Sequence, residues 1–115
     1  MTAIAKTGGV VGIRYIERQT TYKLLVDECE HLAKRIGIDH VGIGWLGHDK
    51  AHPFTGYLPG ITKPERKAEG VEAQSMYEHW ETLIRLLEER GFKDDDIGKI
   101  VGGNFLRVMR AVLPA

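Results

Sequence analysis

Residues 1–44 alternate between short apolar runs and one long amphipathic stretch, a pattern that predicts strand, helix and strand. Residues 2–6 look like the last turn of a helix that stops at Thr7, Gly8 and Gly9. The apolar run over residues 9–13 is typical of a strand buried on both faces. Thr20 or Thr21 is then expected to cap a helix that runs to Ile36. Its apolar stripe, spaced by three and four residues, is Leu25, Cys29, Leu32 and Ile36.

Gly37 ends this helix, and a second strand is expected over residues 40–44. Because a helix separates the two strands, they are expected to run parallel, as in a βαβ unit. Glycines alternate with Val41 and Ile43 in the second strand, so another group must approach its backbone closely, and a crowded barrel interior would do so. Parallel sheets occur mostly with several strands covered on both faces. The sequence therefore predicts an α/β fold that is part of a larger barrel or doubly wound sheet.

Residues 45–72 show no periodic pattern and contain three prolines. A loop of this length in a compact chain is usually functional or disordered. It leaves the carboxyl end of a parallel strand, where α/β folds build their active sites. We therefore divide the chain into a helix end and βαβ unit over 1–44, an active-site-side loop over 45–72, and C-terminal helices over 73–115.

The C-terminal stretch is expected to be helical, with one apolar face made of Met76, Trp80, Leu83, Ile84 and Leu87. Gly91 ends this helix, and a short helix follows the acidic run at residues 94–96. Residues 102–104, with the sequence Gly-Gly-Asn, precede the last helix and suggest either a joint between helices or, less strongly, a phosphate site. We expect His31 and His79 on helix surfaces, and His40 in a structural role at the entrance of the second strand.

Charge and composition exclude several partners. Sixteen basic and sixteen acidic residues give a formal net charge of zero, without a basic run that would favour nucleic acid or anionic lipid. A near-neutral chain is also less protected against self-association. The single cysteine, Cys29, allows neither an internal disulfide nor a thiolate metal cluster, and we expect it to be a small buried hydrophobe. With neither a signal peptide nor a membrane-spanning run in the sequence, we expect a cytoplasmic, reducing location.

The strongest local cluster of candidate chemistry is residues 47–53, which contain His48, Asp49 and His52. Two histidines with an acid after the first resemble a helical zinc motif, in which both imidazoles lie on one face of a helix. Here Gly47 and Pro53 flank a stretch without helical periodicity, and two ligands do not define a site. A solvated loop with incidental histidines is the simpler interpretation. Asp49, just beyond a strand's carboxyl end, is suited to acid–base catalysis, or is otherwise a turn former.

Two stretches together resemble the membrane dipeptidase (renal dipeptidase) family. Residues 37–44, Gly-Ile-Asp-His-Val-Gly-Ile-Gly, look like its last barrel strand, and residues 94–108, which include Gly-Gly-Asn-Phe-Leu-Arg-Val, look like its C-terminal helices. Residues 3–12 are similar to its preceding helix–strand junction. The resemblance implies the last strand–helix units of a TIM-like (β/α)8 barrel followed by C-terminal helices, incomplete as a barrel on its own.

The resemblance also implies a zinc-dependent hydrolase that cleaves dipeptides with a water activated by two metals. The family's zinc ligands come from earlier barrel strands, so no residue here matches a ligand and this chain alone is expected to hold no zinc. The family places a proton-shuttling aspartate two residues after the Gly-Ile-Gly run, and this chain has Leu46 there. Leucine cannot transfer a proton, so either Asp49 replaces that aspartate or the role is lost.

Two functional hypotheses follow. The first is the C-terminal part of a dipeptidase-like zinc hydrolase, completed by an N-terminal barrel segment and inactive without it. In that case Asp49 is the candidate catalytic residue, and Trp45, His48 and Tyr57 are the candidate contacts to a dipeptide substrate. The second is a non-catalytic remnant that associates with itself through exposed apolar faces and unpaired strand edges. An independent small-molecule binding module is a third possibility, without a pocket signature in the sequence.

Overall fold

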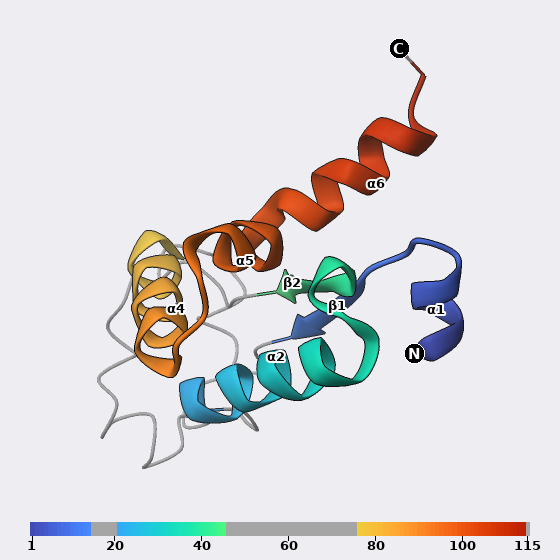
Figure 1. The fold of residues 1–115 in the computed structure, drawn as a ribbon. Coiled ribbons are helices and arrows are strands. Elements are labelled where there is room, and N and C mark those ends of the chain that lie inside the picture. Colours follow the sequence, from blue (N-terminus) through green and yellow to red (C-terminus); the bar gives the residue numbers. More distant parts are fainter. Residues whose placement is uncertain (15–20, 46–75, 115) are drawn as a thin grey trace, which may run out of the picture.

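The computed structural model describes residues 1–14, 21–45 and 76–114 (Figure 1). These residues form a mixed arrangement of helices and two strands, consistent with part of an α/β domain. In chain order, the elements are α1 (Thr2–Lys6), β1 (Val11–Arg14), α2 (Tyr22–Ile36), the 3₁₀ turn η1 (Ile38–His40), β2 (Val41–Trp45), α4 (Met76–Arg90), α5 (Asp94–Gly98), the kinked segment η4 (Lys99–Gly103) and α6 (Asn104–Val112). None of the described helices is both long enough and apolar enough to cross a membrane.

The two strands pair in parallel, as the βαβ pattern predicts. Val11 lies opposite Val41, and Ile13 lies opposite Ile43, with α2 as the crossover. β1 begins at Val11, two residues later than expected. β2 begins one residue later than expected, because His40 belongs to a 3₁₀ turn in which its N–H donates to the Gly37 carbonyl. The βαβ unit is confirmed, and the larger barrel is not shown by the described residues.

One face of the strand pair carries branched side chains and forms the core. Ile13, Val41 and Ile43 are buried there against α2. The stripe of α2 packs as its spacing predicts, and Cys29 is buried. The core continues into α4 and α5, and Trp80 is half-buried against it. Its buried apolar members are Ile13, Tyr22, Leu25, Val26, Cys29, Leu32, Val41, Ile43, Leu83, Leu87, Ile97 and Ile100.

The opposite face of the strand pair carries glycines, and Phe105 of α6 packs onto it. A Cβ atom added to Gly42 would overlap the Phe105 ring and would lie only 3.0 Å from Val10 Cγ1. The expected close approach to the glycine backbone is therefore confirmed, and the approaching group is an aromatic ring from the last helix. Figure 1 shows the strands between α2 on one side and α5 and α6 on the other.

Candidate functional site

The carboxyl end of the strand pair is where the sequence places the active site. β1 ends at Arg14 and β2 at Trp45, and the register slips between Ile13 and Arg14, so that Arg14 pairs with Trp45. Trp45, which the sequence analysis assigns to the loop, is the last residue of β2, and only its backbone is described. The other candidates in the loop, His48, Asp49 and Tyr57, lie outside the described residues, as does Leu46. The described residues therefore do not test the grouping of these four candidate side chains.

A buried polar pair, Tyr22 and His79, joins α2 to α4. The Tyr22 hydroxyl forms a hydrogen bond with Nδ1 of His79, and their ring centroids are 6.0 Å apart. Tyr22 is the first residue of α2, whose start is fixed by Thr21, since Thr21 Oγ1 accepts a hydrogen bond from the Leu24 N–H at 3.2 Å. His79 lies in the first turn of α4. Both helices follow segments that leave the carboxyl ends of the strands, so the pair belongs to the active-site side of the fold.

The expectation that His79 lies on a helix surface is wrong, because its side chain is only 2% exposed. A signal for this was present in the sequence. His79, Leu83 and Leu87 recur every four residues, and all three are buried on the same face of α4. A histidine on such a stripe needs a polar partner once it is buried. Tyr22, at the start of the α2 stripe, is one such partner.

The Tyr22–His79 pair is suited to holding α2 and α4 together. When the imidazole carries its proton on Nε2, Nδ1 accepts the hydrogen bond that the Tyr22 hydroxyl donates. Burial in low dielectric strengthens such a bond and makes breaking it costly. The pair therefore ties the first turn of α4 to the first turn of α2, next to the strand ends.

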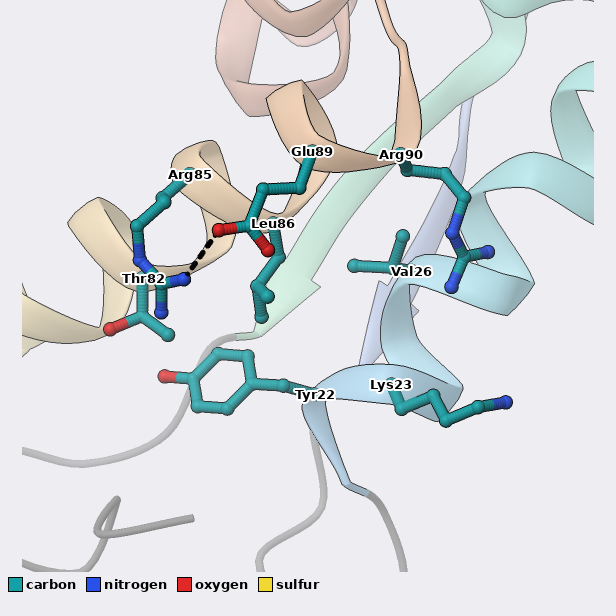
Figure 2. A pocket seen from close by; sticks show the side chains of 8 residues that line it. All are labelled: Tyr22, Lys23, Val26, Thr82, Arg85, Leu86, Glu89 and Arg90. Carbon is teal, nitrogen blue, oxygen red and sulfur yellow. Dashed lines mark hydrogen bonds and ion pairs between the residues drawn. The ribbon is translucent and has the colours of Figure 1, made fainter.

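Beside this pair lies a groove of about 420 Å³ between α2 and α4 (Figure 2). Figure 2 shows the Tyr22 ring pointing toward α4 on the side of Thr82 and Leu86. The lining is apolar at its centre and charged at its rim, and consists of Tyr22, Lys23, Val26, Thr82, Arg85, Leu86, Glu89 and Arg90.

The charges at the rim of this groove neutralise one another. Arg85 pairs with Glu89 at 2.8 Å, and Arg90 pairs with Asp27 at 2.8 Å and with Glu30 at 3.0 Å. Hydrogen bonds from Lys23 and then Arg90 lower the pKa of Asp27. Because each cation of the rim already has a carboxylate partner, the groove offers little net charge to an ionic substrate.

The side chains that the structure describes do not form a zinc site. Within residues 1–14, 21–45 and 76–114, no three His, Cys, Asp or Glu side chains come close enough to hold a metal ion. Burial also raises the pKa of the Cys29 thiol to about 12, so that it is neither a thiolate ligand nor a nucleophile at neutral pH. The described residues thus do not fit the zinc pair that the family resemblance implies.

The amino end of the strand pair is held by polar side chains of the last helix. The Asn104 amide donates to the carbonyls of Ile38 and Val41, each at 2.8 Å. Arg107 donates to the Gly8 carbonyl at 3.0 Å and to the Asp39 carbonyl at 2.8 Å. Residues 102–104 are therefore a joint between helices, the favoured of the two interpretations, and Asn104 is a clamp that sequence reasoning did not identify.

Two other side chains complete this clamp. Nδ1 of His40 donates to the Gly9 carbonyl at 2.8 Å, which confirms a structural role for His40 at the strand entrance. Lys99 pairs with the Asp39 carboxylate at 2.7 Å. The strand pair thus has a clamped amino end, and a carboxyl end faced by the Tyr22–His79 pair.

Comparisons with known proteins agree with the sequence motifs. The model of the membrane dipeptidase family, peptidase family M19, matches residues 1–114. The dipeptidase verJ of Clonostachys rogersoniana is 34% identical over an alignment of 110 positions, which covers 91% of this chain and 24% of that protein. The dipeptidase ataJ of Aspergillus terreus is 31% identical over an alignment of 117 positions, which covers 95% of this chain and 24% of that protein.

The dipeptidase tcpJ of Claviceps purpurea is 30% identical over 94 residues, covering 82% of this chain and 18% of that protein. No solved structure matches the chain. The chain spans about a quarter of the length of the first two relatives. With a family match over nearly all of its residues, the chain belongs to the membrane dipeptidase family.

Proposed function

We propose that this chain is the C-terminal part of a zinc-dependent dipeptidase-like hydrolase with a TIM-like barrel. The observation that carries the proposal is the family match over residues 1–114 of a chain that spans about a quarter of two curated relatives. The parallel βαβ unit supports it, because parallel strands are normally buried within larger sheets or barrels. In this proposal an N-terminal barrel segment supplies the remaining strands.

The proposal divides the chemistry between two segments. The barrel segment carries the zinc ligands, and bound zinc lowers the pKa of a water molecule and polarises the scissile carbonyl of a dipeptide. This chain supplies the loop over 45–72 at the carboxyl end of β2, with Asp49 as the acid–base residue and Trp45, His48 and Tyr57 as substrate contacts. The Tyr22–His79 pair supports this end by joining the helices that flank it.

The runner-up is a non-catalytic remnant that assembles with itself. Leu46 stands where the family has its proton-shuttling aspartate, and large apolar side chains are exposed on α6. A cytoplasmic location also remains a proposal, supported by the single unpaired cysteine.

The test combines a measurement of mass in solution with dipeptide hydrolysis. The purified chain is assayed with zinc, alone and together with the segment of the Clonostachys relative that precedes its region of similarity. We expect the chain alone to be inactive and the mixture to show zinc-dependent turnover. Zinc-dependent turnover by a clean monomer of the chain would refute both hypotheses. An inactive, defined oligomer that the added segment leaves unchanged would favour the remnant.

The role of Asp49 is tested in the active mixture. Asp49→Asn should abolish turnover, because an amide does not transfer the proton. Asp95→Asn, at an exposed position in the first turn of α5, is the matched control and should retain it. Equal rates for both variants would remove Asp49 from the mechanism while leaving the proposed segment division in place.

A further inference from the structure

The inner face of α6 contacts the strand pair and binds its amino end. Asn104 and Arg107 bind backbone carbonyls there, and Phe105 packs onto the glycine face of the strands. Figure 1 shows the helix continuing from this anchor away from both strands. The position and direction of α6 are therefore fixed by its first turn, and the remainder extends past the described sheet.

The outer face of α6 is apolar and exposed. It is made of Leu106, Met109 and, just past the last residue of the helix, Leu113, whose side chains are 50%, 49% and 62% exposed. Leu106, Met109 and Leu113 follow the spacing of a single helical stripe. Gathered large apolar side chains of this kind mark interaction surfaces in folded proteins.

Arg107 binds two backbone carbonyls that lie just after the ends of helices. The Gly8 carbonyl lies just after the end of α1, and the Asp39 carbonyl lies just after the end of α2. Both carbonyls belong to connections that lead from a helix into a strand. Cations are favoured at such helix ends, because the macrodipole and the unpaired carbonyls concentrate negative charge there.

Arg110 lies about one turn farther along α6, toward the exposed end. Within the described part of the chain it forms no ion pair, and it stands beside the apolar outer face. In a (β/α)8 barrel, each crossover helix returns the chain to the amino ends of the strands, so further helix-to-strand connections lie along the same rim. A second copy of α6 fits this face less well, because α6 carries Arg107 and Arg110 and no acidic residue.

We infer that the outer face of α6 is the docking surface for the N-terminal barrel segment, with Arg110 bound to carbonyls of a helix-to-strand connection in that segment. This inference rests on the proposed function and names the contact through which the two segments join. The surface lies at the amino end of the strands, opposite the catalytic loop. Substitutions on this surface should therefore change the affinity between the two segments and leave the turnover of the assembled complex unchanged.

The test measures binding of the chain to the segment of the Clonostachys relative that precedes its region of similarity. We expect Met109→Glu to raise the dissociation constant by about tenfold or more, since it places a charge in an apolar interface. Arg110→Gln should raise it by about threefold to tenfold, through loss of a charge-assisted hydrogen bond. At saturating concentrations, both variants should show wild-type zinc-dependent turnover.

Matched controls are available on α2. Leu24→Glu and Arg35→Gln replace an exposed leucine and an exposed arginine of that helix, and both should bind as the wild type does. Because Met109 and Arg110 are also exposed, circular dichroism should show unchanged folding of their variants.

The outcomes separate this inference from the proposed function. If the unmodified chain restores activity and the α6 variants bind equally well, the docking surface is wrong and the proposed function stands. If the relative's own C-terminal stretch binds its segment and this chain does not, the proposed function itself fails. Self-association of the chain that Met109→Glu abolishes would assign the face to a second copy instead.

Discussion

The two faces of the β1–β2 pair are built from opposite kinds of residue. The branched face buries Ile13, Val41 and Ile43 in a core that several helices share. On the glycine face, the Phe105 ring and the Val10 side chain are the nearest groups to Gly42. Apolar side chains of various shapes can pack against branched residues, whereas the space over a glycine backbone restricts the size and position of the ring that packs there. The first face therefore supplies stability, and the second fixes where α6 lies.

The largest expected effect lies on the branched face. Leu25→Ala should lower the free energy of unfolding by about 2–5 kcal/mol, because it leaves a cavity in a fully packed core. Leu24→Ala is the matched control, since Leu24 is the preceding residue of α2 and is 48% exposed. Urea unfolding followed by circular dichroism measures both variants. Similar losses for the two variants would contradict the assigned packing face of α2.

The next effect tests the glycine face. Gly42→Ala should lower the free energy of unfolding by about 1–3 kcal/mol, because its Cβ would overlap the Phe105 ring. At Gly44, the nearest atoms to an added Cβ are 3.4 Å or farther away, so Gly44→Ala should cost less.

A double variant sharpens this test. Phe105→Leu shortens the side chain that meets Gly42, so part of the cost of Gly42→Ala should disappear in the Gly42→Ala, Phe105→Leu double variant. Strictly additive losses in the double-mutant cycle would show that the ring and the glycine do not constrain each other.

A smaller effect tests the clamp that brings Phe105 onto this face. Asn104→Ala should lower the free energy of unfolding by about 1–2 kcal/mol, because the carbonyls of Ile38 and Val41 lose the donor they share. Asn104→Asp should cost more, since it preserves the size of the side chain and directs a carboxylate at the two carbonyls. Chemical denaturation of the three proteins ranks them, and a stable Asp variant would refute the donor role of Asn104.

The parts of this fold that the sequence predicts depend on local spacing. The α2 stripe with Cys29 and the glycine-terminated helices follow from patterns within about fifteen residues. The parallel βαβ unit follows from the order of such local patterns along residues 9–44. Gly37 and Gly91, for example, adopt φ angles of 94° and 97°, which favour glycine at the ends of these helices. Such features are predictable because residue spacing and backbone geometry determine them within a single segment.

The features that the sequence did not predict depend on contacts between distant segments. Local spacing along α4 indicates that His79 shares the buried stripe, but its hydrogen-bond partner, Tyr22, stands on another helix. The group over Gly42 was expected to come from a barrel interior, and it is Phe105 from the last helix. The sequence predicts Asn104 only as part of a joint between helices, because local spacing does not reveal its hydrogen bonds to the distant start of β2. The loop candidates around Asp49 are untested, since they lie outside the described residues.

The smallest expected effect is the contribution of the Lys99–Asp39 ion pair to the free energy of unfolding. A hydrogen bond from Lys99 is the main cause that lowers the pKa of Asp39 below its ordinary value of 3.8. A carboxyl group with a lower pKa in the folded state stabilises the fold above its unfolded value, and this stabilisation is lost as the pH falls through the lower folded value. Because the Asp39 side chain is 59% exposed, solvent screening limits the contribution to about 0.5 kcal/mol or less.

Asp39→Asn removes this titration and keeps the backbone carbonyl that Arg107 binds. The difference in unfolding free energy between wild type and variant should therefore be small at neutral pH and should shrink to zero in acid. Denaturation curves at neutral pH and at a pH well below the ordinary value of 3.8, below the lowered pKa of the folded state, measure it. A difference that persists in acid would mean that Asp39 contributes through packing and not through its charge. The attachment of α6 to the glycine face would then depend on the bonds from Asn104 and Arg107 to backbone carbonyls, and not on the Lys99–Asp39 ion pair.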